Sequence, residues 1–328
     1  MKEILEYLFE YNKLEYDQAK KILIDITSNK YSNSEIASFM TIFKMRNPSV
    51  EEMEGFRDAL LEQCIKIDFS DFNAVDLCGT GGDGKDTFNI STISSFVVAG
   101  SGFKVSKHGN YGVSSNCGSS NVLEHLGVKF SNDESQLKKC LDKSNICYLH
   151  APLFHPSMKN VAPVRKELGF KTFFNLLGPL VNPSNPKNQI TGVYSLEIAR
   201  LYGYIFKNTN KNFSIVYSLD GYDEISLTEC FKLINNSSEI ISDSNYFKLP
   251  KTQAKDILGG NSIKDSANIF KKVLNGEGTK SQKNVVLANS SLAIKTITNK
   301  DIDECVEIAK ESLESGKANN SLKKLIEI

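Results

Sequence analysis

The chain has 328 residues, of which 40% are hydrophobic and 24% are charged. These proportions are typical of a globular protein, and the length allows a large core and about two domains. Lysine plus arginine number 39, as do aspartate plus glutamate, so the formal net charge is zero. This balance argues against a protein whose main partner is a nucleic acid, because such binding depends on clustered cationic charge. It leaves room for a local basic pocket that binds a small phosphate ligand.

The seven cysteines are scattered and include no Cys-x-x-Cys pair. An odd, unpatterned set predicts reduced thiols rather than a disulfide framework. Residues 1–6 are amphipathic and acidic, unlike a signal peptide. Apolar runs in the sequence are too short to span a bilayer. We therefore expect a cytoplasmic protein without a membrane partner.

Residues 1–66 show the spacing of short amphipathic helices. Apolar residues recur on one helical face within 4–9 and again within 19–26. Capping-box sequences at 32–35 and 49–52 predict two further helix starts. We expect a helical domain over these residues, whose apolar stripes form either an internal core or a surface for a partner.

From residue 73 onward, short β-favouring runs alternate with helical patterns. The runs lie at 73–77, 102–106, 145–149, 190–194, 213–218 and 284–287. The helical patterns lie near 89–100, 118–127, 134–143, 196–207, 262–275 and 301–315. This alternation predicts an α/β domain over 73–328 with a mostly parallel sheet, interrupted by a hairpin or excursion within 228–258. In such a sheet, ligands bind beyond the carboxyl ends of the strands.

A cluster of glycines follows the first predicted strand. Residues 76–84 read Asp-Leu-Cys-Gly-Thr-Gly-Gly-Asp-Gly, and a predicted helix begins at Asn89, with Ser91 and Thr92 in its first turn. Glycine lets backbone amides approach a ligand closely, and a helix N-terminus favours an anion. The pattern therefore predicts a phosphate site. It is neither a Walker loop nor a dinucleotide fingerprint, and a simple turn is the alternative interpretation.

Two more polar clusters follow predicted strands. Residues 107–115, with Ser119 beyond them, combine a lysine, glycines and serines, which is the composition of a second anion-binding loop. For His108, a structural role explains the residue as well as a functional one does. Asp223 and Glu224 are adjacent carboxylates after the fifth predicted strand, which suggests magnesium held between protein and phosphate. The alternative is a solvated surface pair.

Arg165 lies on an otherwise apolar helical segment. A guanidinium can bind a carboxylate through two parallel hydrogen bonds, so this residue is a candidate for recognising a carboxylate ligand. A structural ion pair explains the residue equally well at this stage.

Taken together, these segments resemble the anthranilate phosphoribosyltransferases. The resemblance spans nearly the whole chain and is carried by residues 79–83, 89–92, 107–110, 165–169 and 223–224. It implies transfer of the phosphoribosyl group of 5-phosphoribosyl 1-diphosphate (PRPP) to the amine of anthranilate, with release of diphosphate, in tryptophan biosynthesis. It also implies a class III fold like that of nucleoside phosphorylases: a small N-terminal helical domain, joined by helices from about 155–185, and a larger α/β domain, in a homodimer.

The resemblance also implies which residues bind each ligand. The residues implied to contact PRPP are Gly79, Gly82, Asp83, Thr87, Asn89, Ile90, Ser91, Thr92, Lys107, His108, Gly109, Asn110, Tyr111, Gly112, Val113, Ser114, Ser115 and Ser119. Those implied for anthranilate are Gly79, Asn110 and Arg165, and those for Mg²⁺ are Ser91, Asp223 and Glu224. An aromatic amine is already unprotonated at neutral pH, so we assign no general acid or base.

The chain departs from the family's pattern in two places. Tyr111 and Gly112 stand where the family often has arginine and a small residue, so the loop has one cation fewer. Either phosphate affinity is lower as a result, or another lysine supplies the charge. Residues 229–231, Glu-Cys-Phe, stand where Gly-Pro-Thr is common, which changes the local shape of that loop.

Two other functions are compatible with the same architecture. A pyrimidine nucleoside phosphorylase would have Lys-Met-Ser where this chain has residues 107–110, and it would not need the pair Asp223 and Glu224. A nucleic-acid-binding relative would be basic and could lack that pair. The zero net charge and the intact carboxylate pair favour the transferase over both alternatives.

Overall fold

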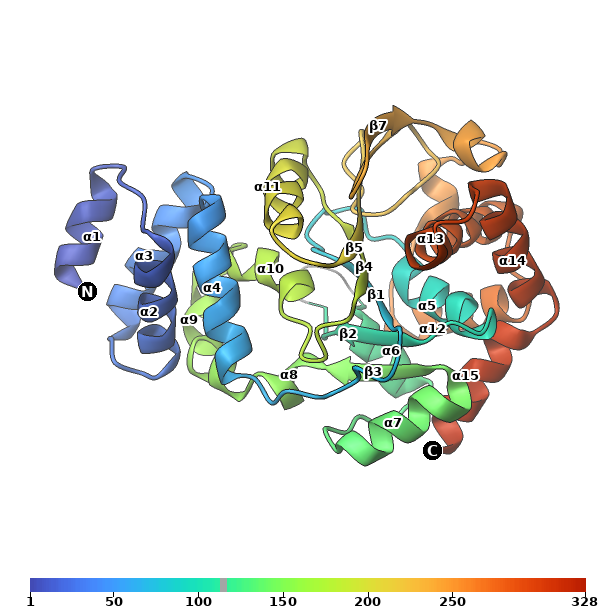
Figure 1. The fold of residues 1–328 in the computed structure, drawn as a ribbon, viewed down its shortest axis with the longest axis horizontal. Coiled ribbons are helices and arrows are strands. Elements are labelled where there is room, and N and C mark those ends of the chain that lie inside the picture. Colours follow the sequence, from blue (N-terminus) through green and yellow to red (C-terminus); the bar gives the residue numbers. More distant parts are fainter. Residues whose placement is uncertain (113–116) are drawn as a thin grey trace. The chain divides into compact units, whose positions relative to one another are not determined.

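The computed structural model describes residues 1–112 and 117–328. Its contacts divide the chain into two compact units (Figure 1). The first, here called the helical unit, comprises Met1–Lys66 and Ala151–Pro183. The second, here called the sheet unit, comprises Ile67–His150 and Ser184–Ile328. Within the described ranges, no helix has the length and apolar character that a membrane crossing requires.

The helical unit consists of short helices. Their bounds are α1 (Lys2–Phe9), α2 (Tyr16–Thr27), α3 (Asn33–Met45), α4 (Val50–Gln63), α8 (Ala151–Phe154), η1 (Pro156–Asn160), α9 (Ala162–Leu168), α10 (Phe174–Leu177) and η2 (Gly178–Leu180). Both predicted capping boxes are confirmed at the starts of α3 and α4. Ser32 Oγ accepts a hydrogen bond from the backbone N of Glu35, and Ser49 Oγ accepts one from Glu52. These caps satisfy amides that a helix start otherwise leaves without partners.

An aromatic cluster joins the two chain segments of the helical unit. The ring centroids of Phe56, in α4, and Phe173, just before α10, are 4.6 Å apart. Phe39 and Phe43 of α3 pack edge-on against both rings. All four side chains are buried, and full burial of one such ring is worth about 1.5–3 kcal/mol. Residues 151–183 thus share a core with α3 and α4.

The sheet unit contains a seven-stranded sheet with the order β3-β2-β1-β4-β5-β6-β7. The strands are β1 (Val75–Gly79), β2 (Val105–Gly109), β3 (Ile146–His150), β4 (Asn188–Gly192), β5 (Asn212–Ser218), β6 (Phe231–Asn235) and β7 (Glu239–Ser242). The first five strands pair in parallel, and β6 and β7 form an antiparallel hairpin. The mostly parallel sheet and the hairpin within residues 228–258 are therefore confirmed.

Helices cover both faces of this sheet. Their bounds are α5 (Ile90–Gly100), α6 (Ser119–His125), α7 (Glu134–Ser144), α11 (Leu196–Lys207), α12 (Ile263–Leu274), α13 (Lys280–Thr298), α14 (Ile302–Glu314) and α15 (Lys317–Glu327), with short 3₁₀ turns η3 (Ser244–Phe247) and η4 (Ala254–Ile257). Helix α11 packs against β5 and β6, whereas α5 and α13 pack on the opposite face against β1, β4 and β5 (Figure 1). Helices thus pack on both faces of the sheet at β5, and most residues of the parallel strands are buried, as such sheets require.

The prediction of a strand at residues 284–287 is wrong, because these residues lie inside α13. The helix begins with a capping box in which Thr279 Oγ1 accepts a hydrogen bond from the backbone N of Gln282. Its residues from Asn284 to Ile294 are all buried. A helix buried on every side has no polar face to mark its period, and the four apolar residues 285–288 that follow one another here form a short run of the kind that also marks buried strands.

The first two strands end later in the chain than the sequence predicts. The runs expected at 73–77 and 102–106 form β1 and β2, which end at Gly79 and Gly109. The pairing of Gly79 with Gly192 extends the β1–β4 ladder into the glycine cluster. Pairing with a neighbouring strand, which the local pattern does not reveal, thus sets where each strand ends. As a result, Lys107 belongs to β2 rather than to the loop that follows it.

Candidate active site

The predicted site residues of the sheet unit gather at the carboxyl ends of β1, β2 and β5. The strand order reverses between β1 and β4, and open α/β sheets bind ligands at such a reversal. Gly79 ends β1 and pairs with Gly192, which ends β4. Asp223 and Glu224 follow β5, which is the next strand in the sheet. The topology therefore brings residues from distant parts of the chain to one edge.

Asp223 fits between the ends of β1 and β4 because glycines leave room for it. A Cβ on Gly79 would lie 2.4 Å from Asp223 Oδ2, and a Cβ on Gly192 would lie 1.6 Å from the Asp223 carbonyl oxygen. Asp223 Oδ2 also accepts a hydrogen bond of 2.7 Å from the backbone N of Gly81. Gly192 is not among the site residues that the sequence predicts. The available signal was a glycine inside a predicted strand, which often marks a close approach of another backbone.

Replacing Gly192 with alanine should displace Asp223 and destabilise the fold. The new Cβ would overlap a backbone oxygen, so the chain itself has to move. We expect the free energy of unfolding to fall by about 3 kcal/mol, the upper part of the range for overpacked cores. Urea denaturation would measure this change.

The matched control for this prediction is Gly203→Ala in α11. A Cβ there would lie 3.6 Å from Ile234 Cγ2, which is an ordinary contact. Alanine is the better helix former, so the control should keep or raise the stability, by up to about 1 kcal/mol. Equal stabilities of the two variants would contradict the packing argument.

Glu224 lies beside the first turn of α5. The backbone N of Ser91 donates a hydrogen bond of 3.1 Å to Glu224 Oε1. The first amides of a helix lack partners within the helix, and the positive end of the helix dipole favours a carboxylate. The structure thus brings Ser91 into contact with Glu224, with Asp223 next to it in the chain.

The surroundings of this carboxylate pair suit a divalent cation. Burial raises the pKa of Asp223 well above its ordinary value, and the Asp83 carboxylate raises it further. Burial likewise raises the pKa of Glu224, with the charge of Asp223 as the next cause. Both shifts indicate negative charge with too little positive charge nearby. The carboxylate oxygens and the Ser91 hydroxyl are hard donors of the kind that Mg²⁺ takes.

Magnesium at this position would need ligands from outside the protein. No cluster of three or more His, Cys, Asp or Glu side chains suited to a metal occurs in residues 1–112 and 117–328. Mg²⁺ usually binds through one or two carboxylates and fills its remaining positions with substrate phosphates and water. The carboxylate pair therefore fits a metal that binds together with a phosphate ligand.

The glycine loop between β1 and α5 contains left-handed backbone conformations, which glycine adopts without strain. Positive φ angles of 64°, 82° and 72° occur at Gly81, Gly82 and Gly84. At the end of the loop, Thr87 forms an antiparallel bridge with Leu258. The loop is thus anchored by a segment more than one hundred and seventy residues later in the chain.

Asn89 connects the two predicted phosphate loops. It precedes α5, and its Nδ2 donates a hydrogen bond of 3.1 Å to the carbonyl oxygen of Cys117. In the same helix start, Ile90 and Thr92 are buried, whereas Ser91 is partly exposed. The partial exposure of Ser91 is consistent with the ligand contact expected of it.

The second loop leaves β2 at Gly109 and is held by α6. Ser119 Oγ donates to the carbonyl oxygen of Asn110 at 3.3 Å, and the backbone N of Gly112 donates to Asn121 Oδ1 at 2.9 Å. The side chain of Tyr111 is exposed. Three predicted contacts of this loop lie outside the described residues: Val113, Ser114 and Ser115.

Lys107 and His108 are not loop residues, contrary to the expectation from the sequence. Both belong to β2 and are buried. The Lys107 ammonium donates a hydrogen bond to the carbonyl oxygen of Leu77 in β1, and the backbone N of His108 donates to Asp76 Oδ1 at 3.2 Å. The positive charge of Lys107 also lowers the pKa of Glu224, against the stronger effect of burial. Lys107 therefore acts on the carboxylates from within the sheet.

Arg165 lies in α9 of the helical unit and is partly buried. Its guanidinium carbon is 5.3 Å from the centroid of the Phe174 ring. Burial lowers its pKa, and no described carboxylate forms a salt bridge with it. The structural ion pair that the sequence left open is therefore not found in the described part of the chain. The guanidinium stays available for a carboxylate ligand.

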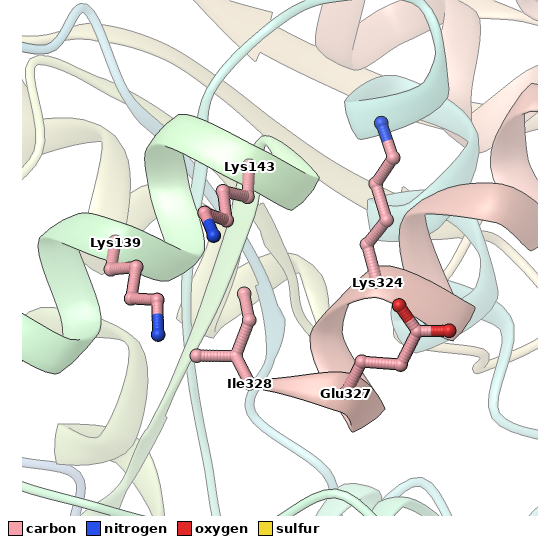
Figure 2. A pocket seen from close by; sticks show the side chains of 5 residues that line it. All are labelled: Lys139, Lys143, Lys324, Glu327 and Ile328. Atoms are coloured by element: carbon pink, nitrogen blue, oxygen red, sulfur yellow. The ribbon is translucent and has the colours of Figure 1, made fainter.

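A separate pocket lies between α7 and α15 (Figure 2). Its volume is about 410 Å³, and it is lined by Lys139, Lys143, Lys324, Glu327 and Ile328. None of these residues belongs to the predicted site, and no strand end or glycine loop contributes to the lining. We therefore do not assign the pocket to the reaction.

Comparison with known proteins places the chain in a family. Residues 2–64 match the glycosyl transferase family, helical bundle domain, and residues 71–319 match the glycosyl transferase family, a/b domain. Two curated relatives are anthranilate phosphoribosyltransferases. That of Christiangramia forsetii is 58% identical, with 99% of this chain and 98% of the relative covered. That of Flavobacterium johnsoniae is 56% identical, with 100% and 99% covered.

Solved structures agree with the sequence relatives. The anthranilate phosphoribosyltransferase of Thermus thermophilus superposes with a TM-score of 0.92 at 27% identity, covering 98% of each chain. The enzyme of Saccharomyces cerevisiae in complex with PRPP and Mg superposes with a TM-score of 0.88 at 28% identity, covering 96% of this chain and 93% of that one. Since both the fold and the sequence agree over nearly the full length, this chain is an enzyme that belongs to the family of anthranilate phosphoribosyltransferases.

Proposed function

We propose that the sheet unit binds PRPP at the carboxyl ends of β1, β2 and β5, and that the enzyme transfers its phosphoribosyl group to anthranilate. The observation that carries this proposal is the packing of Asp223 and Glu224 against the glycine loop and the start of α5. Two phosphate loops and a carboxylate pair at one sheet edge suit a ligand with two separated phosphate groups and a metal. The contacts proposed for PRPP are those that the family resemblance implies.

In the proposed reaction, the amine nitrogen of anthranilate attacks C1 of the ribose. The C1–O bond to diphosphate breaks with its electron pair passing to the diphosphate oxygen, and the nitrogen gives up a proton to form N-(5-phosphoribosyl)anthranilate. Because the amine is unprotonated at neutral pH, the chain's contribution is positioning and stabilisation of the leaving group. We therefore propose no residue as general base.

Ser91, Asp223 and Glu224 are the residues we propose to hold Mg²⁺. The metal, when bound, neutralises charge on the departing diphosphate. The raised pKa values of the two carboxylates support this assignment, because a bound cation would supply the positive charge that these buried groups lack. The yeast relative, whose structure contains both PRPP and Mg, supports the same metal.

For anthranilate, we propose that Arg165 binds the carboxylate and that Gly79 and Asn110 supply further contacts. The support for Arg165 is a partly buried guanidinium with no described salt-bridge partner. Gly79 ends β1 and Asn110 directly follows β2, so both lie at the sheet edge where the two loops begin.

We also propose that the enzyme is a cytoplasmic homodimer that associates through the helical unit. Four large apolar side chains of this unit are exposed by 44%, 60%, 74% and 76%: Tyr7, Phe9, Tyr11 and Met45, respectively. Tyr7 and Phe9 lie in α1, Tyr11 follows it, and Met45 ends α3, which packs against α1; exposed apolar groups gathered on neighbouring elements are typical of contact surfaces. Light scattering should give twice the mass of one chain, and a monomer would contradict the proposal.

The proposed reaction is tested directly with the purified protein. Incubated with anthranilate, PRPP and magnesium, it should consume anthranilate, which is followed as loss of fluorescence, and release one diphosphate per anthranilate. An absence of turnover, combined with phosphorolysis of thymidine or with DNA binding, would instead support one of the two alternative functions.

A further inference from the structure

The glycine loop contains one lysine, Lys85, that none of the expectations above includes. It lies between Gly84 and Asp86, both of which have positive φ. Its backbone N donates a hydrogen bond of 3.1 Å to Asp83 Oδ1. The lysine is therefore part of the tight turn that also places Gly81 against Asp223.

The side chain of Lys85 lies over the ring of Tyr222. Its Nζ is 4.8 Å from the ring centroid, within the range of a cation–π contact. Tyr222 is only 4% exposed, and it directly precedes Asp223 in the chain. The lysine stem also passes close to Gly221, where an added Cβ would lie 3.5 Å from Lys85 Cε. The ammonium is thus held next to the segment that carries the carboxylate pair.

No described carboxylate forms a salt bridge with Lys85, although Asp83 is two residues away. Lys107, the other lysine of the two loop segments, is 2% exposed and donates its ammonium to Leu77 within the sheet. Lys85 is partly exposed. The two lysines in the described part of these loop segments therefore differ. Lys107 donates to a protein oxygen, whereas the ammonium of Lys85 lies over an aromatic ring and the residue is partly exposed. A lysine that only balanced a local carboxylate would pair with it.

We infer that Lys85 binds the diphosphate group of PRPP and that the Tyr222 ring positions its ammonium. This inference rests on the proposed function and adds a residue to it. A lysine ammonium binds phosphate as a point charge with three donors, and an aromatic face on one side of the ammonium leaves the donors on its other side for a phosphate. The position beside the carboxylate pair selects the diphosphate, because the metal that this pair is proposed to hold would neutralise charge on that group.

The test compares Lys85→Met, Lys85→Arg and Lys264→Met. Lys264 is an exposed lysine of α12, so its replacement removes the same charge without touching the loop. The readouts are the affinity for inorganic diphosphate with magnesium, measured by titration calorimetry, and the two KM values. Lys85→Met should weaken diphosphate binding and raise the KM for PRPP about tenfold, the effect of one lost charge-assisted hydrogen bond. The KM for anthranilate should change less than about twofold on the same reasoning.

The companion variants separate binding from folding. Lys85→Arg keeps a cation and should restore most of the diphosphate affinity, and Lys264→Met should match the wild type. Tyr222→Phe keeps the ring and should bind normally, whereas Tyr222→Leu should weaken diphosphate binding about threefold through loss of the cation–π contact.

An active wild type together with unchanged diphosphate affinity in Lys85→Met would overturn the assignment of Lys85 alone. A wild type that neither binds diphosphate nor consumes anthranilate would overturn the proposed function as well. Equal losses in Lys85→Met and Lys264→Met would show a general charge effect and would also overturn the assignment.

Discussion

A variant with Asp223→Asn and Glu224→Gln should lose turnover by about 100-fold or more at low magnesium, because two charged ligands worth about 1.5–3 kcal/mol each are removed. The amides keep the volume of the carboxylates, and they can still accept the hydrogen bonds from Gly81 and Ser91. Raised magnesium should recover part of the rate. The measurement is the magnesium dependence of anthranilate consumption.

The same variant should be at least as stable as the wild type when magnesium is withheld. Burial raises the pKa of both carboxyls in the metal-free fold above their pKa in the unfolded chain. As the pH rises above the unfolded-chain pKa, ionisation of these buried groups therefore lowers the free energy of unfolding. Amides remove that cost at neutral pH. Unchanged or higher thermal stability together with lost activity would separate metal binding from misfolding.

Glu229→Gln is the matched control for the carboxylate pair. Glu229 is an exposed carboxylate five residues beyond Glu224, so its loss should leave the magnesium dependence unchanged. A double variant that kept its full rate at low magnesium would contradict the proposed metal ligands.

The second large effect is expected for Arg165→Ala, which should raise the KM for anthranilate about 50-fold, within the range for a lost charged, bidentate hydrogen bond. The KM for PRPP should change far less, because Arg165 is proposed to contact only the carboxylate of the other substrate. The guanidinium has no described salt-bridge partner to lose, so the effect on folding should be small. Steady-state kinetics with each substrate varied in turn measures both constants.

Two further variants sharpen this prediction. Arg165→Lys keeps the charge but not the planar fork, so it should recover only part of the affinity for anthranilate. Arg200→Ala removes an exposed arginine from α11 and should leave both KM values unchanged. Equal increases in the two KM values of Arg165→Ala would show that Arg165 does not act on anthranilate alone.

Much of the architecture can be predicted from local sequence. Capping boxes at residues 32–35 and 49–52 mark real helix starts, because the cap bonds form within four residues. The alternation of strand and helix patterns from residue 73 onward predicts the mostly parallel sheet, because side-chain periodicity follows from backbone geometry. The wrong strand at 284–287 shows the limit, since a helix buried on all sides loses that periodicity.

The amino-acid sequence alone predicts which chemical groups are available: a glycine loop, a second polar loop, a carboxylate pair and one arginine on an apolar helix. How these groups are used depends on the way distant segments pack together. Asp223 reaches Gly81 across 142 residues and needs the empty space at Gly192. Lys107 lies within strand β2, whereas the ammonium of Lys85 lies over the ring of Tyr222. Such contacts depend on strand pairing and packing between segments far apart in the chain, and no local pattern encodes them.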